Sequence, residues 1–153
     1  TDKQIQIEQL QTSEMQKLQK EITATKSLVM LSLLQQRSAS DRIKAVNYTY
    51  EMEEINAEVA EALIYTINND PSSNVRLAAC EALSQYTGVE KVKQALVATI
   101  SQQTDPALQI FLVDLMVAME EKSAVPEMQK LLQEQELIDI VQGKIYEGMD
   151  KLM

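Results

Sequence analysis

Histidine and tryptophan are absent from this sequence of 153 residues, and cysteine and phenylalanine occur once each. Without histidine, the chain lacks the side chain that most often serves as a general base and as a metal ligand. The single Cys80 can form neither an intramolecular disulfide nor a paired-thiol zinc site. Glycine-rich phosphate loops and nucleophile-elbow motifs are missing as well. We therefore expect no cofactor, no bound metal ion and no enzymatic activity.

Glycine and proline are scarce too, with three residues of each. The chain is instead rich in Leu, Ala, Gln, Glu and Lys, which favour helices, and 45% of its residues are apolar. This composition predicts a folded, all-α protein. The net charge of −9 argues against nucleic acid or an anionic membrane surface as the main partner.

Long apolar runs are also lacking. A membrane-spanning helix needs ~18 consecutive apolar residues, whereas the most apolar stretch covers only residues 28–34 and contains Ser32. The sequence begins with Thr1 rather than Met, so we expect that any signal peptide or membrane span lies before Thr1.

Residues 70–83 contain the motif around which the rest of the chain is organised. Asp70-Pro71 ends one expected helix, and Ser72-Ser73 offers a cap for the next. Ala79 and Ala82 lie three residues apart on that second helix, so they share a face that another helix can approach closely.

A related pattern recurs along the chain. Asp70-Pro71 reappears 35 residues later as Asp105-Pro106, with Asp as an N-cap and Pro at the first helical position. Ile43-Lys44 precedes Val75-Arg76 by 32 residues, and Phe111 stands where the third copy would carry the basic residue. Periods of ~20–50 residues are typical of repeat proteins, in which each helix pair buries its apolar face against its neighbours.

The apolar periodicity predicts a long N-terminal helix, three helix pairs and a final helix. We expect them at about residues 1–37, 39–52, 57–68, 72–86, 90–102, 106–119, 124–133 and from 138 onward, with Gly88 as a helix stop. The expected core includes Val75, Ala79, Ala82, Leu83, Leu96 and Ile110. Other expected inward positions are Ile43, Val46, Tyr50 and Ile138.

Residues 1–37 form the first predicted region, and residues 38–153 the second. The first carries a narrow apolar stripe of the kind seen in coiled coils, interrupted at Glu14 and Thr25, and the stripe widens over residues 28–34, which predicts burial there. This helix is either a solvated extension or an oligomerising stalk. A stalk would make its contacts through Ile7, Leu10, Met15, Leu18, Ile22 and Val29.

The motif at residues 70–83 resembles the first helix of a HEAT or HEAT-like repeat, in which an Asp-containing turn precedes Val-Arg, small residues and Leu. The matching residues, including those of the next copy, are Asp70, Val75, Arg76, Ala79, Ala82, Leu83, Asp105 and Pro106. The resemblance covers residues 38–153 and implies a short, armadillo-like α–α superhelix that binds other proteins. It also implies that Asp70 and Arg76 brace the turn rather than bind a ligand.

A second resemblance concerns the order of the segments. A Gln-rich helix, then Ser-Ala-Ser-Asp-Arg-Ile-Lys-Ala-Val-Asn-Tyr at residues 38–48, then the Val-Arg repeat, is similar to the soluble C-terminal part of bacterial single-span membrane proteins with an anti-sigma-like zinc-binding domain. This implies a periplasmic scaffold with a membrane span before Thr1. HEAT-like repeats also resemble those of bilin-attaching lyases, which leaves an accessory subunit of an enzyme as an alternative. A purely structural oligomer and a cytoplasmic location are further alternatives.

In such a repeat protein the second helices of successive pairs line one surface. That surface would carry an acidic strip beside a basic one, which suits a protein or peptide of mixed charge. A tyrosine supplies the one large anchor, a residue type that tends to dominate binding energy. The candidate partner-binding residues are Glu58, Glu61, Tyr65, Lys91 and Gln94.

Three other features have both a structural and a functional interpretation. The glutamates at 51, 53, 54, 58 and 61 could hold a cation, but we expect a solvated face because no second ligand type accompanies them. Cys80 is expected to be a small buried hydrophobe rather than a reactive thiol. The helix at 106–119 is apolar on nearly every side, so it is either covered by the final helix or exposes a sticky patch.

Overall fold

The computed structural model describes all residues from 1 to 153 and contains eight α-helices, four short 3-10 segments and no strand. The all-α class and the long N-terminal helix are therefore confirmed. Contacts between residues divide the chain into two compact units, Thr1–Glu53 and Glu54–Met153, called here the N-terminal and the C-terminal unit. None of the helices combines the length and the hydropathy that crossing a membrane requires.

The N-terminal unit consists of α1 (Asp2–Leu34), α2 (Ala39–Asn47) and the 3-10 segment η1 (Tyr48–Glu51). Thr1 caps α1 in a capping box with Gln4, and Ser38 caps α2 by accepting the backbone N–H of Asp41 at 3.4 Å. The last turns of α1 pack against α2 and bury Ser27 and Met30. The capping box predicted at Ser38 is thus present in its N-cap half.

Two expectations about burial in this unit are wrong. Leu28 and Val29 are 70% and 40% exposed, because α2 contacts only the side of α1 that carries Met30. Tyr50 is also exposed, and Thr49 is buried in its place. The chain leaves the α-helix at Asn47 and winds more tightly through η1, which changes the direction in which each side chain points.

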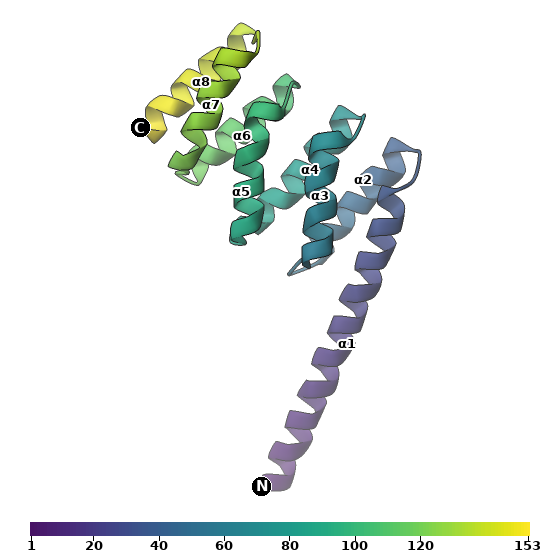
Figure 1. The fold of residues 1–153 in the computed structure, drawn as a ribbon. Helices are drawn as coiled ribbons and strands as arrows, with labels where there is room; N and C mark the ends of the chain where they lie inside the picture. Colours follow the sequence, from purple (N-terminus) through teal and green to yellow (C-terminus); the bar gives the residue numbers. More distant parts are fainter. The chain divides into compact units, whose positions relative to one another are not determined.

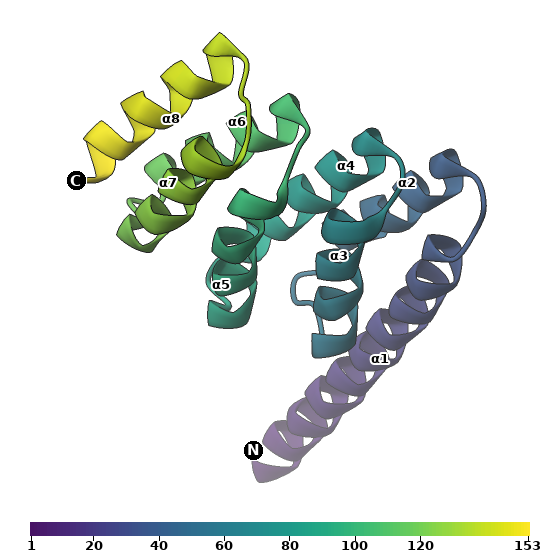
Figure 2. The same cartoon turned by 45° about the horizontal axis from the view of Figure 1, so that its top comes forward.

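The C-terminal unit holds the other six helices, each connected to the next by a short turn or 3-10 segment. They are α3 (Ala57–Asn69), α4 (Ser73–Leu83), α5 (Glu90–Thr99), α6 (Pro106–Ala118), α7 (Val125–Glu134) and α8 (Asp139–Leu152). The 3-10 segments are η2 (Ser84–Tyr86), η3 (Ile100–Gln102) and η4 (Lys122–Ala124). In both Figure 1 and Figure 2, α3, α5 and α7 follow one another along one side of this unit, and α4, α6 and α8 along the other.

The core of this unit lies between those two rows of helices. Five of the six predicted core residues are buried, and Ile110 is half-buried. The fully buried large side chains are Leu63, Ile67, Leu83, Leu96, Ile100, Leu108, Leu112, Met116, Met128, Leu131 and Ile145. Ile138, expected to point inward, is 55% exposed because it is the N-cap residue of α8 rather than part of its buried face.

The final helix α8 packs against α6, so the apolar α6 is covered on the side that α8 occupies. The approach is close at Gly148: a Cβ atom there would lie 2.8 Å from Cγ1 of Val113. Gly88, in contrast, does not stop a helix through a left-handed conformation, since no glycine has a positive φ. The helix that precedes it ends earlier, at Leu83, and continues as η2.

The N-caps correct the register of the repeat. Ser38, Ser72 and Asp105 begin α2, α4 and α6, so the spacings are 34 and 33 residues rather than the predicted 32 and 35. Asp105 therefore corresponds to Ser72, not to Asp70. Asp70 instead ends α3, and its Oδ1 accepts the backbone N–H of Ser72 at 2.9 Å.

The corrected register reveals a shared brace four residues after each cap. Arg42 Nη1 donates to the carbonyl of Gln36 at 3.0 Å, and Arg76 Nη1 to that of Asp70 at 2.6 Å. In α6, Gln109 Nε2 donates in the same way to a carbonyl six residues earlier, at 2.7 Å. Gln109, and not Phe111, thus occupies the position of Arg76.

Candidate partner-binding surface

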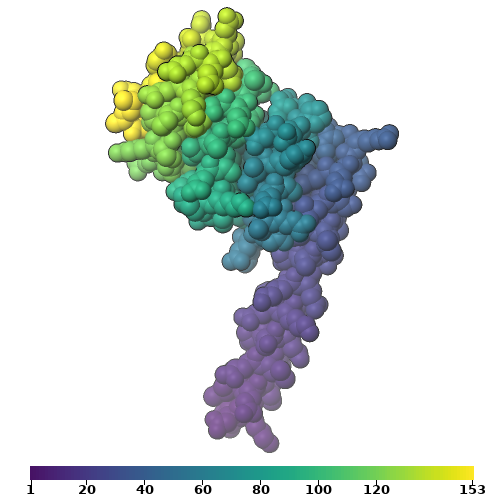
Figure 3. All heavy atoms as spheres, in the orientation of Figure 1, coloured from purple at the N-terminus to yellow at the C-terminus, as the bar shows by residue number.

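The predicted surface lies on α3 and α5, which pack side by side in the C-terminal unit and face the viewer in Figure 1 and Figure 3. Asn56 caps α3 by accepting the backbone N–H of Val59 at 2.8 Å, which starts the helix and fixes which residues point outward. Glu58, Glu61 and Tyr65 follow at spacings of three and four, so they share the exposed face.

The structure brings the predicted acidic and basic residues into direct contact. Lys91 Nζ on α5 lies 2.8 Å from Oε1 of Glu61 on α3, and both side chains are about 60% exposed. The hydrogen bond from Lys91, together with its charge, lowers the pKa of the Glu61 carboxyl. The pair links the two helices at the surface, and because water and salt screen it, its contribution to stability is small.

Tyr65 stands one turn beyond Glu61 and is 69% exposed. On α5, Gln94 Nε2 donates to Oε1 of Glu90 at 3.4 Å, and at the start of α3 Glu58 is exposed. The five predicted residues therefore form one exposed surface across two helices, with an aromatic ring beside an ion pair.

A second ion-pair cluster adjoins this surface at the start of α5. Lys93 Nζ lies 3.1 Å from Oε2 of Glu90 and 3.3 Å from Oε2 of Glu121, just before η4. These hydrogen bonds and charges raise the pKa of Lys93. The pKa of Glu121 is lowered, chiefly by the hydrogen bond from the Ser123 hydroxyl.

A chain of amide hydrogen bonds links the other ends of these helices, and sequence analysis missed it. Thr99 Oγ1 donates to Oδ1 of Asn68, and Gln103 Nε2 donates to Thr99 Oγ1 at 2.9 Å. The carbonyl of Gln103 accepts from Nε2 of Gln109 at 2.7 Å and from Nε2 of Gln135 at 3.0 Å. Gln109 Nε2 also donates to Oε1 of Gln135 at 3.1 Å.

This network, called here the amide chain, runs from the end of α3 through α5 and the start of α6 to the end of α7. Gln103 and Gln109 are only 4% and 1% exposed, and no buried side-chain polar atom lacks a partner. The available sequence signal was the corrected 33-residue spacing, which aligns Gln109 with Arg76 and marks it as a turn-bracing residue.

The comparisons with known proteins give no relative. No family model, no curated protein and no solved structure matches this chain. The surface is therefore interpreted from its own geometry.

The residues predicted to be structural in the repeat lie in the turns and the core. Asp70 and Arg76 hold the turn between α3 and α4, as described above, and Asp105 accepts the backbone N–H groups of Ala107 and Leu108 at 2.9 and 3.4 Å. Pro106 is at the first position of α6. The apolar members, all with no exposed surface, are Val75, Ala79, Ala82 and Leu83.

The other reactive candidates have ordinary environments. Cys80 is fully buried, and burial, followed by the charge of Glu81, raises the pKa of its thiol to about 12, so the thiol stays protonated at neutral pH. No three His, Cys, Asp or Glu side chains are grouped so that they could hold a metal ion. Within the N-terminal unit, Glu51 lies 3.7 Å from Nζ of Lys26.

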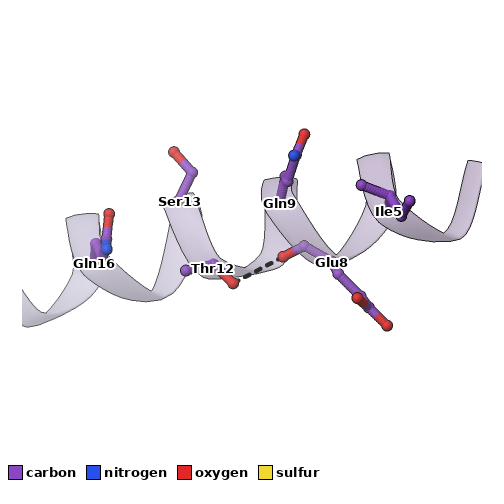
Figure 4. Close-up of a pocket in the computed structure, with 6 residues that line it drawn as sticks. All are labelled: Ile5, Glu8, Gln9, Thr12, Ser13 and Gln16. Carbon is purple, nitrogen blue, oxygen red and sulfur yellow. Dashed lines mark hydrogen bonds between the residues drawn. The ribbon is translucent and has the colours of Figure 1, made fainter. Parts of the chain in front are cut away.

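The predicted oligomerisation residues are all exposed on α1. Their side chains are between 40% and 62% exposed: Ile7, Leu10, Met15, Leu18, Ile22 and Val29. Figure 4 shows a shallow groove near the start of the same helix, lined by Ile5, Glu8, Gln9, Thr12, Ser13 and Gln16. All six lining residues are exposed and belong to one helix, so the groove encloses no volume shielded from water.

Proposed function

We propose that this chain is a protein-interaction module without catalytic activity, in which HEAT-like helix pairs form a short α–α superhelix. A protein or peptide of mixed charge binds across α3 and α5. The observation that carries this proposal is the exposed ring of Tyr65 beside the Glu61–Lys91 ion pair.

The repeated local structure supports the HEAT-like part of the proposal. Each of α2, α4 and α6 begins at a capped position, and each places a side-chain N–H on a carbonyl six residues before it. In α4 and α6 the buried positions also agree, falling three, seven, eight and eleven residues after the cap: Val75, Ala79, Cys80 and Leu83 match Leu108, Leu112, Val113 and Met116. Such regularity is what stacking of equivalent helix pairs requires.

The chemistry of the surface supports a partner of mixed charge. A tyrosine ring carries a large apolar area and a hydroxyl that can hydrogen-bond, so it gains free energy when a partner covers it. The adjacent carboxylate and ammonium group can each be met by an opposite charge on the partner. A polyanion would meet the carboxylates of Glu58 and Glu61 and be repelled.

We further propose that the module belongs to the extracytoplasmic part of a membrane-anchored bacterial regulatory protein. The support is the resemblance in segment order, with a Gln-rich helix preceding the Val-Arg repeat. In that arrangement α1 separates the helix pairs from the membrane, and the partner is recruited at the surface of α3 and α5.

The test is affinity capture from an extract of the source organism, followed by mass spectrometry. The variant carries Tyr65→Ala and Lys91→Glu, and we expect it to lose the proteins that the parent captures. Its matched control carries Tyr146→Ala and Lys151→Glu on α8, where a 59% exposed tyrosine lies near an equally exposed lysine paired with Glu147 at 3.0 Å.

Both variants should unfold at nearly the parent temperature, because all four side chains are exposed. If the Tyr65 variant captures the same proteins as the parent, the partner does not bind across α3 and α5. If the α8 control loses them as well, the effect reflects net charge rather than this surface.

A further inference from the structure

The apolar stripe of α1 lies on the side of the helix that faces away from α2. At ~3.6 residues per turn, Ser27 points about 180° away from Leu18, and Met30 about 120° away. Those two residues are the ones buried on α1, whereas Val29, which continues the stripe, is 40% exposed. The stripe is therefore not an extension of the face that packs against α2; it is a second, separate face.

The stripe stays on one side for the whole helix. Ile7, Leu18 and Val29 follow one another at intervals of 11 residues, which is close to three full turns of a straight α-helix, ~10.8 residues. All residues from 1 to 25 are exposed. An apolar face of this length is the pattern of a helix that pairs with another helix along its axis.

The charges beside the stripe match a second copy of the same helix in parallel. In a parallel coiled coil, a residue on one flank faces the residue five positions later on the opposite flank of the partner helix. Lys3 would face Glu8 of the second copy, and Glu21 would face Lys26. Leu10 would face Met15 in the same way, so the flanking pairs are opposite in charge or apolar.

We propose that α1 forms a parallel, in-register coiled-coil dimer with a second copy of this chain. The contact residues are Ile7, Leu18, Ile22 and Val29, flanked by Leu10 and Met15. The dimer is independent of the surface on α3 and α5, so either proposal can fail without the other.

One residue in the stripe opposes this pairing. Glu14 lies about 40° from Leu18 around the helix, so its carboxylate falls at the edge of the contact and near its own copy in a parallel dimer. Replacing it with leucine would remove the repulsion and add apolar contact. An increase in affinity on Glu14→Leu is therefore specific to this interface.

The first test is sedimentation equilibrium of the full chain over a range of concentrations. We expect Leu18→Asp to weaken dimerisation by at least about 100-fold and Glu14→Leu to strengthen it by about tenfold or more. The matched control is Ile5→Asp, since Ile5 is 52% exposed but lies about 140° from Leu18 around the helix. This control should change the dimer affinity by less than about threefold.

The second test determines the orientation by disulfide cross-linking in a Cys80→Ser background. Ile7→Cys and Ile22→Cys are prepared as separate proteins, and each should form a homodimeric disulfide. In an antiparallel pair only residues at the centre of the overlap face their own copy, so two positions 15 residues apart cannot both cross-link to themselves.

Three results would overturn the proposal. One is a parent chain that remains monomeric at high concentration. Another is equal weakening by Leu18→Asp and Ile5→Asp, which would mean that the stripe is not the interface. The third is cross-linking only between Ile7→Cys and Ile22→Cys proteins in a mixture, which would establish an antiparallel pair.

Discussion

The close approach of α8 to α6 gives a sharp test of the packing in the C-terminal unit. α8 contains two glycines in equivalent helical conformations but different surroundings. Gly143 is exposed, and a Cβ atom there would meet nothing within 4 Å. Gly148 is buried, and its Cβ would lie 2.8 Å from Cγ1 of Val113 and 3.4 Å from Cγ2 of Val117.

The expected magnitudes follow from two opposing effects. Replacing a helix-interior glycine with alanine stabilises the helix by about 0.5–1 kcal/mol. Gly143→Ala should show this gain in full. At Gly148 the added methyl must displace Val113, whose branched side chain has little rotamer freedom within a helix, and overpacking of this kind costs about 1–3 kcal/mol. Gly148→Ala should therefore be neutral or destabilising by up to about 2 kcal/mol.

The measurement is urea unfolding followed by far-UV circular dichroism, with the two alanine variants compared directly. A second measurement uses the Val113→Ala background, in which the clash is absent and Gly148→Ala should no longer be destabilising. If Gly148→Ala stabilises the parent chain as much as Gly143→Ala does, α8 does not approach α6 as closely as described, and the reasoning fails.

Three further predictions concern the core, the turn braces and the ion pairs. Leu83→Ala should lower the free energy of unfolding by about 2–5 kcal/mol, and Ala79→Leu by about 1–3 kcal/mol, both measured in urea; the wild-type value for Leu83→Ala would contradict its full burial. Arg76→Met, which leaves the carbonyl of Asp70 without its side-chain donor, should cost about 1–3 kcal/mol, whereas an exposed Lys122→Met should change stability little. Because the pKa values of Glu61 and Glu147 are lowered in the folded state, chiefly by hydrogen bonds from Lys91 and Lys151, their stabilisation is present above the ordinary value of 4.5 and is lost as the pH falls below it. That loss should be small and should diminish in high salt, and an unfolding midpoint that rises between pH 5 and pH 3 would contradict it.

Helix positions could be predicted because local chemistry determines them. Ser38, Ser72 and Asp105 cap their helices through their own side-chain oxygens, and Pro106 begins α6 as its position after Asp105 indicates. Which residues are buried depends on neighbours far away in the sequence. Leu28 and Tyr50 were misjudged for that reason: an apolar side chain is buried only if another element covers it, and α2 lies on the opposite side of α1 from the stripe.

The candidate surface shows the same division. Helical spacing alone places Glu58, Glu61 and Tyr65 on one face of α3. The 2.8 Å contact between Glu61 and Lys91 depends instead on how α3 and α5 pack, and no local pattern specifies it. The spacing identified the residues, whereas only the structure shows that two of them neutralise each other and leave Tyr65 as the principal anchor.

The two kinds of turn brace differ in how far their effects can extend. An arginine side chain only donates hydrogen bonds, so the brace at Arg76 is complete once it reaches the carbonyl of Asp70. A glutamine amide both donates and accepts, and Gln109 donates to the carbonyl of Gln103 and also to Oε1 of Gln135. Gln135 in turn donates to that same carbonyl, which joins the end of α7 to the turn before α6. The substitution of an amide for a guanidinium at this one repeat position therefore converts a local brace into a bridge between successive helix pairs, and it does so where the network is nearly free of water.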